Sequence, residues 1–383
     1  MSDLGTRYWG SFAVLALLCI GFQLYARQKK SDEGKVSSMR FTAFQKNYLI
    51  VFLLAMFSDW LQGPYVYQLY VSYGFSQQQI AELFVCGFGS SMIVGTFVGG
   101  LADKLGRKKM CIVYCLCYIV ACFTKLVPEY WTLMLGRFLS GIATSLLFSA
   151  FESWMVCEHA KSGFEPAWLG QTFSYATFGN GLVAVVAGLV ANSAADTYGF
   201  VAPFVLALLP LTVVAGMVSL TWTENYGNEQ LDLCASLIKG FQLIQSDSRI
   251  AALGAGQSCF EGAMYTFVFM WTPALKTDAE KIADETGDLS IVTTSQYLGL
   301  IFAVFMVSVM VGSSLFSILA TDKAEIMKIP LYLHGAAFGA MALITMFLDN
   351  KFLVYCMFLV FECSVGLFYP AYGVIKSEKV LYP

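Results

Sequence analysis

Charged residues are scarce in this sequence. Of its 383 residues, 13% are Asp, Glu, Lys or Arg, whereas a soluble domain carries about 25%. The formal net charge is -3, so the chain offers no basic surface for nucleic acid. We therefore exclude nucleic acid as a partner and disfavour a soluble enzyme.

Residues for metal binding and catalysis are few or scattered. The chain has two His, His159 and His334, and most of its 11 Cys lie inside apolar runs. It lacks the paired Cys or Cys/His spacing of a zinc site. It also lacks the nucleotide-binding pattern G-x-x-x-x-G-K-[ST] and the hydrolase patterns H-E-x-x-H and G-x-S-x-G. We predict no catalytic residue, no metal and no cofactor.

Apolar length is what the sequence has in abundance. Hydrophobic residues make up 57% of the chain, and about 20 apolar residues in a row cross a bilayer as a helix. Windows of this kind lie at 8–26, 47–69, 80–101, 110–127, 131–156, 169–194, 200–222, 251–275, 292–318, 329–348 and 352–374. We predict an all-α, multi-pass integral membrane protein of about 11 transmembrane helices.

The first window has two interpretations. It could be a signal peptide, but it has no small-residue cleavage pattern, and the basic run RQKK at 27–30 follows it. These features favour a retained extra helix at the N-terminus.

Basic residues are unevenly divided between the two sets of alternate loops. Seventeen of the 23 Lys and Arg fall in one set and five in the other. Since basic loops stay in the cytoplasm, we predict an N-terminus outside the membrane and a C-terminus inside.

The windows form two groups around a longer polar stretch. The predicted parts are an N-terminal helix with its linker at 1–46, a six-helix bundle at 47–222, a cytoplasmic connector at 223–250 and a four-helix bundle at 251–383. Phe151-Glu152 in the first bundle is echoed by Phe361-Glu362 in the second. This weak echo indicates two bundles related by a pseudo-repeat.

Acidic residues inside the windows are functional candidates, because a charge within a bilayer is costly. Glu82 lies in the first turn of its window and can reach water. The deeper acids fall on the first helices of successive triplets, namely Asp59, Glu152, Glu261 and Glu362. We assign Asp59 to the substrate site and the three Glu to coupling or gating. The alternative, acids that merely bond neighbouring helices, stays open.

Lys125, at the end of the window 110–127, is counted with the following loop, which leaves Arg137 as the one basic residue well inside the windows. Its guanidinium can donate two parallel hydrogen bonds to a tetrahedral oxyanion. The alternative is a structural ion pair with an acid of a neighbouring helix, and both stay open.

The Gly63-Pro64 pair lies inside the first window of the six-helix bundle. Such a pair breaks or kinks a helix, and the freed backbone groups need polar surroundings. The polar residues at this break that we assign to the substrate site are Gln62, Tyr65 and Tyr67.

A glycine-rich and basic motif lies in the short loop after residue 101. It matches, at every defined position, the G-x-x-x-D-[RK]-x-G-R-[RK]-[RK] signature of the major facilitator superfamily, which the chain therefore resembles. The matching residues are Gly99, Asp103, Lys104, Gly106, Arg107, Lys108 and Lys109. The resemblance implies a conformational latch. Asp103 can hold a helix N-terminus or an Arg.

Longer runs resemble the molybdate-anion transporter branch of that superfamily. They lie at 58–70, 135–159, 222–227 and 260–275. The resemblance implies secondary active uptake of molybdate across the plasma membrane by alternating access, and it excludes an enzyme. Arg137 with Gly141 resembles a superfamily motif associated with proton coupling. The residues do not separate molybdate from sulfate or tungstate, and they leave the coupling ion and the oligomeric state open.

The chain departs from this family in one respect. Members continue for two more helices, whereas this sequence stops soon after residues 370–373. The alternative function is therefore a non-transporting interaction partner of the full-length transporter.

Overall fold

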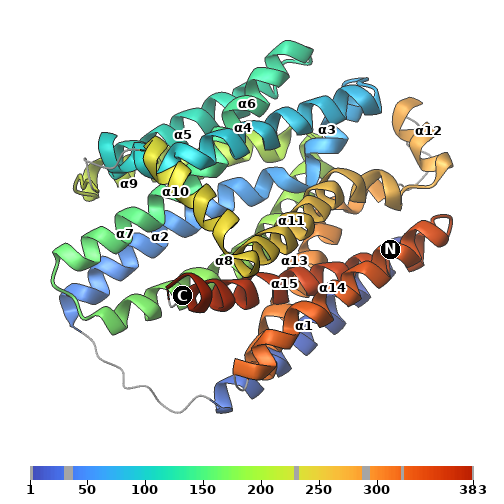
Figure 1. Ribbon diagram of the computed structural model, residues 1–383. Coiled ribbons are helices and arrows are strands. Elements are labelled where there is room, and N and C mark those ends of the chain that lie inside the picture. Colours follow the sequence, from blue (N-terminus) through green and yellow to red (C-terminus); the bar gives the residue numbers. More distant parts are fainter. Residues whose placement is uncertain (1–2, 30–37, 228–232, 287–293, 321–322, 382–383) are drawn as a thin grey trace. The chain divides into compact units, whose positions relative to one another are not determined.

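The computed structural model describes residues 3–29, 38–227, 233–286, 294–320 and 323–381 (Figure 1). Over these residues the regular structure consists of helices, without a strand. The predicted all-helical fold is confirmed. The chain forms two compact units, one of Val36–Leu237 and one of Met1–Lys35 with Ile238–Pro383.

The unit of Val36–Leu237 is a helical bundle. Its elements are α2 (Met39–Gln62), η1 (Gly63–Tyr65), α3 (Val66–Ser72), α4 (Gln77–Leu105), α5 (Arg107–Thr124), α6 (Tyr130–Leu147), α7 (Ala150–Lys161), α8 (Pro166–Tyr198) and α9 (Ala202–Thr221). Helix α2 packs on α8 and α9, and α6 packs between α4 and α5. The boundary between the two units falls within α10 (Leu233–Ser246).

The other unit combines the first helix with the C-terminal ones. Its elements are α1 (Asp3–Lys29), α11 (Ser248–Leu275), α12 (Asp278–Thr286), η2 (Thr294–Tyr297), α13 (Leu298–Leu319), α14 (Lys323–Met346) and α15 (Lys351–Leu381). Helix α1 packs along α13. The hydroxyls of Ser11 and Tyr355 lie 2.7 Å apart, and Gln23 donates to Ser314 at 3.2 Å. The predicted extra helix is therefore built into this unit by polar as well as apolar contacts.

Nine helical segments of the described chain are long and apolar enough to cross a membrane. Two further predicted windows, 110–127 and 251–275, form helices of a more polar kind. Helix α5 begins with three basic residues, and α11 contains Gln257 and Glu261. Both helices are long enough to span a membrane. They therefore differ from the nine apolar segments in their charged and amide groups, not in length.

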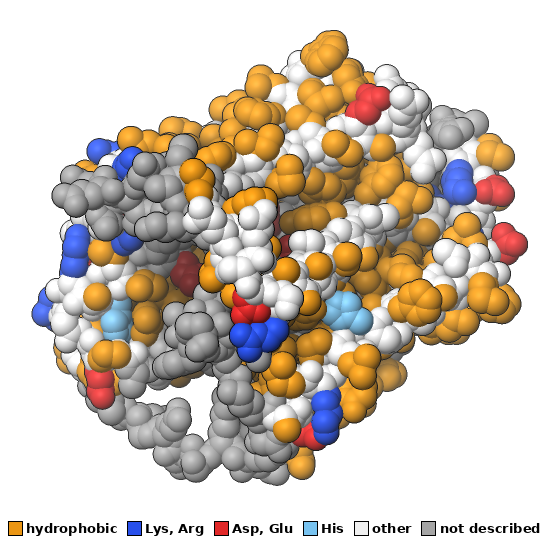
Figure 2. All heavy atoms as spheres, in the orientation of Figure 1, with side chains coloured by type: hydrophobic (Ala, Val, Ile, Leu, Met, Phe, Trp, Pro, Cys, Tyr) orange, Lys and Arg blue, Asp and Glu red, His pale blue; other side chains and the backbone are white. Residues whose placement is uncertain are grey.

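Large apolar side chains are exposed on the surface of the protein. Leu17, Leu220 and Phe338 are 69%, 87% and 77% exposed. Figure 2 shows hydrophobic side chains over much of the visible face, with few charged groups between them. Exposure on this scale is stable where lipid covers the surface.

Two predicted helices are interrupted. The break at Gly63-Pro64 is confirmed, since α2 ends at Gln62 and the 3-10 turn η1 follows. The sequence also predicts one helix over 131–156, but the structure divides it between α6 and α7. Here the Ser149 hydroxyl donates to the Ser145 carbonyl at 2.6 Å. Such a bond competes with regular helix geometry.

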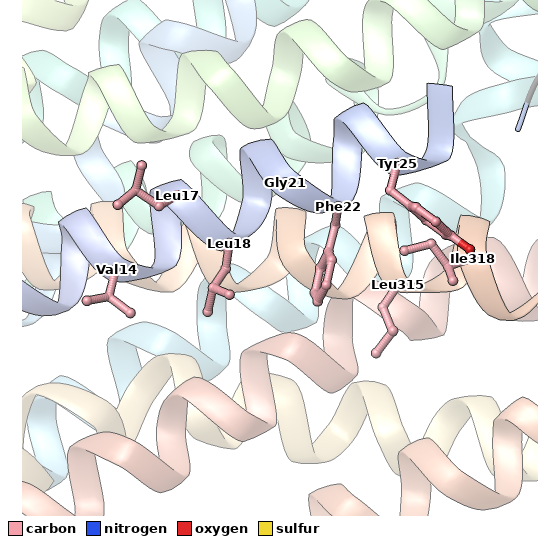
Figure 3. A pocket seen from close by; sticks show the side chains of 8 residues that line it. All are labelled: Val14, Leu17, Leu18, Gly21, Phe22, Tyr25, Leu315 and Ile318. Atoms are coloured by element: carbon pink, nitrogen blue, oxygen red, sulfur yellow. The ribbon is translucent and has the colours of Figure 1, made fainter. Parts of the chain in front are cut away.

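An open groove of about 710 Å³ lies between α1 and α13 (Figure 3). Its lining consists of Val14, Leu17, Leu18, Gly21, Phe22, Tyr25, Leu315 and Ile318. Apart from the Tyr25 hydroxyl, these side chains carry no hydrogen-bonding group. The groove therefore lacks the donors that an oxyanion needs.

Candidate functional site

Asp59 lies on α2 and is half-buried. Its Oδ1 accepts a hydrogen bond from the hydroxyl of Tyr118 on α5. One turn away, the Tyr114 hydroxyl donates to the Ala55 carbonyl at 3.0 Å. Two tyrosines thus join α5 to α2, and the carboxyl group of Asp59 is bonded to a neutral donor rather than to a cation.

Arg137 lies on α6 and faces α4. Its Nε donates to the Leu83 carbonyl at 3.2 Å, and its guanidinium lies 4.8 Å from the centre of the Phe84 ring. It rests on Gly87, where a Cβ would lie 2.7 Å from Arg137 Nη2. None of the carboxylates described by the structure lies within 4.0 Å of it. It is nonetheless close enough to interact electrostatically with Asp59.

The polar residues beside the helix break are all buried in the bundle. The side-chain amide of Gln62 donates to the Ser58 carbonyl at 3.1 Å, and the Tyr65 hydroxyl donates to Asn192 of α8 at 3.3 Å. Tyr67 is buried as well. Gln62 thus bonds within its own helix, and Tyr65 joins the break to α8. The substrate contacts assigned to these three residues stay predictions.

Glu261 on α11 and Glu362 on α15 lie in the same region of the other unit. Both interact electrostatically with the Tyr369 hydroxyl. Glu261 also accepts a hydrogen bond from Gln257 at 2.7 Å. Glu362 is 6% exposed and has no hydrogen-bonding partner among the described residues. Both predicted acids are therefore within electrostatic range of one tyrosine.

Glu152 lies in a different setting. It is exposed in the first turn of α7 and lines a pocket of about 440 Å³ together with Arg107, Cys157 and Tyr226. Arg107 belongs to the predicted latch. The structure therefore places Glu152 with the latch, whereas Asp59 and Arg137 are associated with each other.

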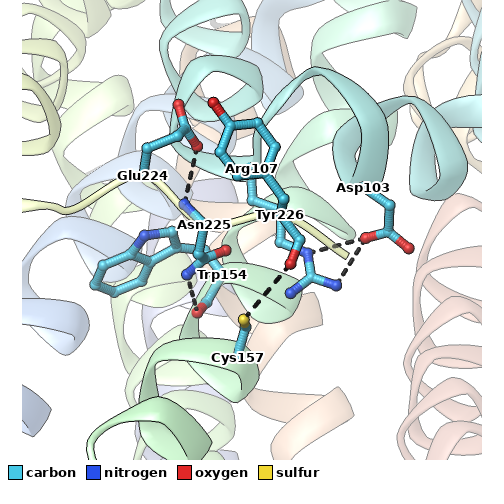
Figure 4. A network of polar contacts seen from close by, with 7 residues as sticks. All are labelled: Asp103, Arg107, Trp154, Cys157, Glu224, Asn225 and Tyr226. Atoms are coloured by element: carbon cyan, nitrogen blue, oxygen red, sulfur yellow. Dashed lines mark hydrogen bonds and ion pairs between the residues drawn. The ribbon is translucent and has the colours of Figure 1, made fainter. Parts of the chain in front are cut away.

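The latch motif forms the turn between α4 and α5. Arg107 donates from Nε and Nη2 to Asp103 Oδ1 at 3.0 and 2.7 Å. The residues after α9 lie against this turn (Figure 4). The Arg107 amide donates to the Asn225 carbonyl at 3.0 Å, and the Gly227 amide donates to the Asp103 carbonyl at 3.1 Å. The latch is thus bonded to residues of its own unit.

Glu224 caps the N-terminus of α5. Its two carboxylate oxygens accept from the Lys108 and Lys109 amides at 2.9 and 3.3 Å. A carboxylate is stabilising there because it meets unpaired amides and the positive end of the helix dipole. Asp103 was predicted to bind either a helix N-terminus or an Arg. In the structure it binds Arg107, and Glu224 caps the helix N-terminus instead. In the sequence, Glu224 was marked only by its place in the family-like run at 222–227.

The residues that carry Glu224 are held in place by α7. The rings of Trp154 and Trp222 stack at 3.7 Å with an interplanar angle of 9°. Trp154 Nε1 donates to the Thr223 carbonyl at 2.8 Å, and the Asn225 side chain donates to the Trp154 carbonyl at 3.1 Å. The cap on α5 therefore depends on contacts between α7 and the segment after α9.

The two glycines of the latch motif are expected to respond differently to alanine. Gly106 has a φ of +105°, and a Cβ there would lie 2.6 Å from the Glu224 carboxyl carbon. Gly99 lies inside α4, where a Cβ would meet no atom within 4 Å. Gly106→Ala should cost about 2 kcal/mol of stability, whereas Gly99→Ala should be neutral or stabilising. Thermal unfolding of the purified variants measures this difference, and equal unfolding temperatures would contradict it.

Known proteins resemble this chain along nearly its whole length. A major facilitator superfamily model described as sugar transporters with 12 TM matches residues 7–367. A molybdate-anion transporter of Takifugu rubripes is 35% identical over 98% of this chain and 82% of its own. The corresponding protein of Xenopus tropicalis is 32% identical over 98% and 81%. The chain belongs to the molybdate-anion transporter family of the major facilitator superfamily.

Solved structures agree on the fold. A nucleoside transporter, NupG, has a TM-score of 0.62 at 13% identity, over 88% of this chain and 82% of that one. A peptide transporter, POT, in complex with sulfate has a TM-score of 0.58 at 14% identity, over 88% and 82%. At these identities the likeness concerns the fold alone. Both comparisons confirm the predicted superfamily fold, and the family consists of multi-pass membrane transporters rather than enzymes.

Proposed function

We propose that this chain is a secondary active transporter that takes up molybdate across the plasma membrane by alternating access. Its N-terminus would lie outside and its C-terminus in the cytoplasm. The observation that carries the proposal is the 35% identity, over 98% of the chain, to a protein named molybdate-anion transporter. The fold shared with other membrane transporters supports the same conclusion.

The surroundings of Arg137 support its role as the anion contact. A guanidinium has five N–H donors, and Arg137 uses the one on Nε for the Leu83 carbonyl. No carboxylate of the described chain is paired with it. The remaining donors can form the forked contact that suits a tetrahedral oxyanion.

Asp59 is our candidate for coupling uptake to protons. It interacts electrostatically with Arg137, so an anion bound to the guanidinium would also experience the charge of the Asp59 carboxyl group. An ionised carboxylate repels a dianion, whereas a protonated one does not. Binding of molybdate therefore favours the protonated form of Asp59, which would carry a proton with the substrate. Glu261 and Glu362 would serve coupling in the other unit, and Glu152 would serve gating beside the latch.

Molybdenum accumulation in cells that express the chain tests this function. We expect elemental analysis to show more molybdenum than in control cells, with a higher rate at acidic than at neutral external pH. Excess sulfate should leave accumulation unchanged if molybdate is the preferred substrate. In Asp59→Asn the rate should lose its pH dependence, because the side chain can no longer exchange a proton. Asp349→Asn, at an exposed aspartate, is the matched control.

Two results would contradict different parts of the proposal. A chain that reaches the cell surface without accumulating molybdenum would overturn molybdate transport. Accumulation that is indifferent to pH in both the wild type and Asp59→Asn would overturn proton coupling but leave transport standing.

A further inference from the structure

Lys125 is a buried lysine that the proposed transport site has not used so far. It follows the last residue of α5 and is 2% exposed. Its ammonium donates to the Tyr70 hydroxyl at 2.6 Å, and its carbonyl accepts from the Tyr73 hydroxyl. Among the described carboxylates, none lies within 4.0 Å of Nζ. A buried ammonium with one neutral partner still has donors for an anion.

Packing between α5 and α6 brings Lys125 close to Arg137. Thr124 precedes Lys125, and Gly136 precedes Arg137. The two helices are in close contact there, since a Cβ on Gly136 would lie 1.9 Å from the Thr124 hydroxyl. Lys125 and Arg137 are also close enough to interact electrostatically. Two cations held together in a bundle repel each other, and a bound anion relieves that repulsion.

The charges of this cluster match a dianion. In its protonated form Lys125 joins Arg137 to give two positive charges, and Asp59 is the carboxyl group that interacts with Arg137. With Asp59 protonated, the three groups carry the charge that neutralises a divalent oxyanion. Without Lys125, the same cluster would balance a monovalent one. The number of positive charges therefore depends on Lys125, which lies at the end of the neighbouring helix α5.

We propose that Lys125 provides the second positive charge of the oxyanion site and sets its preference for divalent over monovalent tetrahedral oxyanions. This inference rests on the proposed transport function. Tyr70 orients the ammonium through its hydroxyl, and Tyr73 fixes the backbone at the same residue. The proposal is distinct from a purely structural role, in which Lys125 would only join the end of α5 to α3.

Two anions of like shape and different charge separate these roles. Molybdate and perrhenate are both tetrahedral oxyanions of similar size, but the first is divalent and the second monovalent. Coulomb energy is proportional to the charge of the ligand, so loss of Lys125 weakens the binding of a dianion more than the binding of a monoanion. A structural defect would weaken both anions by the same factor.

The experiment is a titration of the purified chain, residues 1–383, with each anion, in which thermal stabilisation reports binding. We expect Lys125→Met to weaken molybdate binding at least about tenfold more than perrhenate binding. Lys125→Arg should restore the preference, since it restores the charge. Lys281→Met removes an exposed lysine that is paired with Asp278, and it should behave as the wild type.

A further pair of variants separates charge from folding. Lys125→Gln keeps a donor for Tyr70 without the charge, so it should reproduce the selective loss of molybdate even where Lys125→Met folds poorly. Tyr70→Phe keeps the charge of Lys125 and should weaken the binding of both anions by a similar small factor. Equal weakening of both anions by Lys125→Gln, or no change, would overturn the inference. A wild-type chain that binds no molybdate would instead contradict the proposed function.

Discussion

Replacement of Arg137 by alanine is expected to reduce the initial rate of molybdate uptake by roughly a hundredfold. Two charge-assisted hydrogen bonds contribute about 3 kcal/mol together, which corresponds to that factor. Arg137→Lys keeps the charge but loses the planar fork, so it should restore only part of the rate. The measurement is molybdenum uptake per transporter molecule at the cell surface.

Two further variants control for charge and position. Arg249→Ala removes an exposed arginine on α11 that is paired with Asp247, and it should leave uptake unchanged. Gly87→Ala keeps Arg137 but places a Cβ 2.7 Å from its Nη2, so the guanidinium must move and uptake should fall. Normal uptake by Arg137→Ala would mean that the anion is bound elsewhere.

Replacement of Gly141 by alanine is expected to have a large effect on folding. A Cβ at Gly141 would lie 1.9 Å from the Ser90 hydroxyl and 2.2 Å from the Gly87 carbonyl oxygen. The second of these atoms belongs to the backbone and cannot move aside, so α4 and α6 would have to separate. Overpacking of this kind costs about 3 kcal/mol. We expect the amount of folded protein in detergent to fall by more than about tenfold.

Gly89 provides the matched control for this packing effect. It lies on α4, and a Cβ there would meet no atom within 4 Å. Gly89→Ala should therefore fold as well as the wild type. Size-exclusion chromatography of both variants after extraction gives the folded fraction. If Gly141→Ala gave the same monodisperse peak as Gly89→Ala, the close contact between α4 and α6 would not limit stability.

Local patterns in the sequence were sufficient to predict much of the fold. Apolar windows predicted the helices because the bilayer demands about 20 apolar residues at each crossing. Gly63-Pro64 predicted the break in its helix because proline removes a backbone donor. The latch motif predicted a short loop after residue 101, and Gly106 in that loop has the positive φ that a tight turn requires.

Contacts between distant residues were beyond these patterns. Tyr118 donates a hydrogen bond to Asp59, which lies 59 residues earlier in the sequence. Glu224 caps α5 by accepting from Lys108, which lies 116 residues earlier. Lys125 looked like a basic residue of a loop, because charge and position at a helix end usually mean exposure to water. Its burial depends on Tyr70 of α3 and on Tyr73, which follows that helix. The division of the helix predicted over 131–156 does not follow from these patterns, because serine competes for backbone carbonyls only in particular geometries.

The packing of α1 against α13 has a consequence for biosynthesis. Helix α1 leaves the ribosome before α13 and α15, but its polar contacts include Ser314 on α13 and Tyr355 on α15. At about 5–20 residues per second, these partners follow after roughly a quarter of a minute to a minute. During that interval Ser11 and Gln23 lack these native partners. An early helix of this unit therefore depends on later ones, and its native contacts are complete only after translation has passed Tyr355.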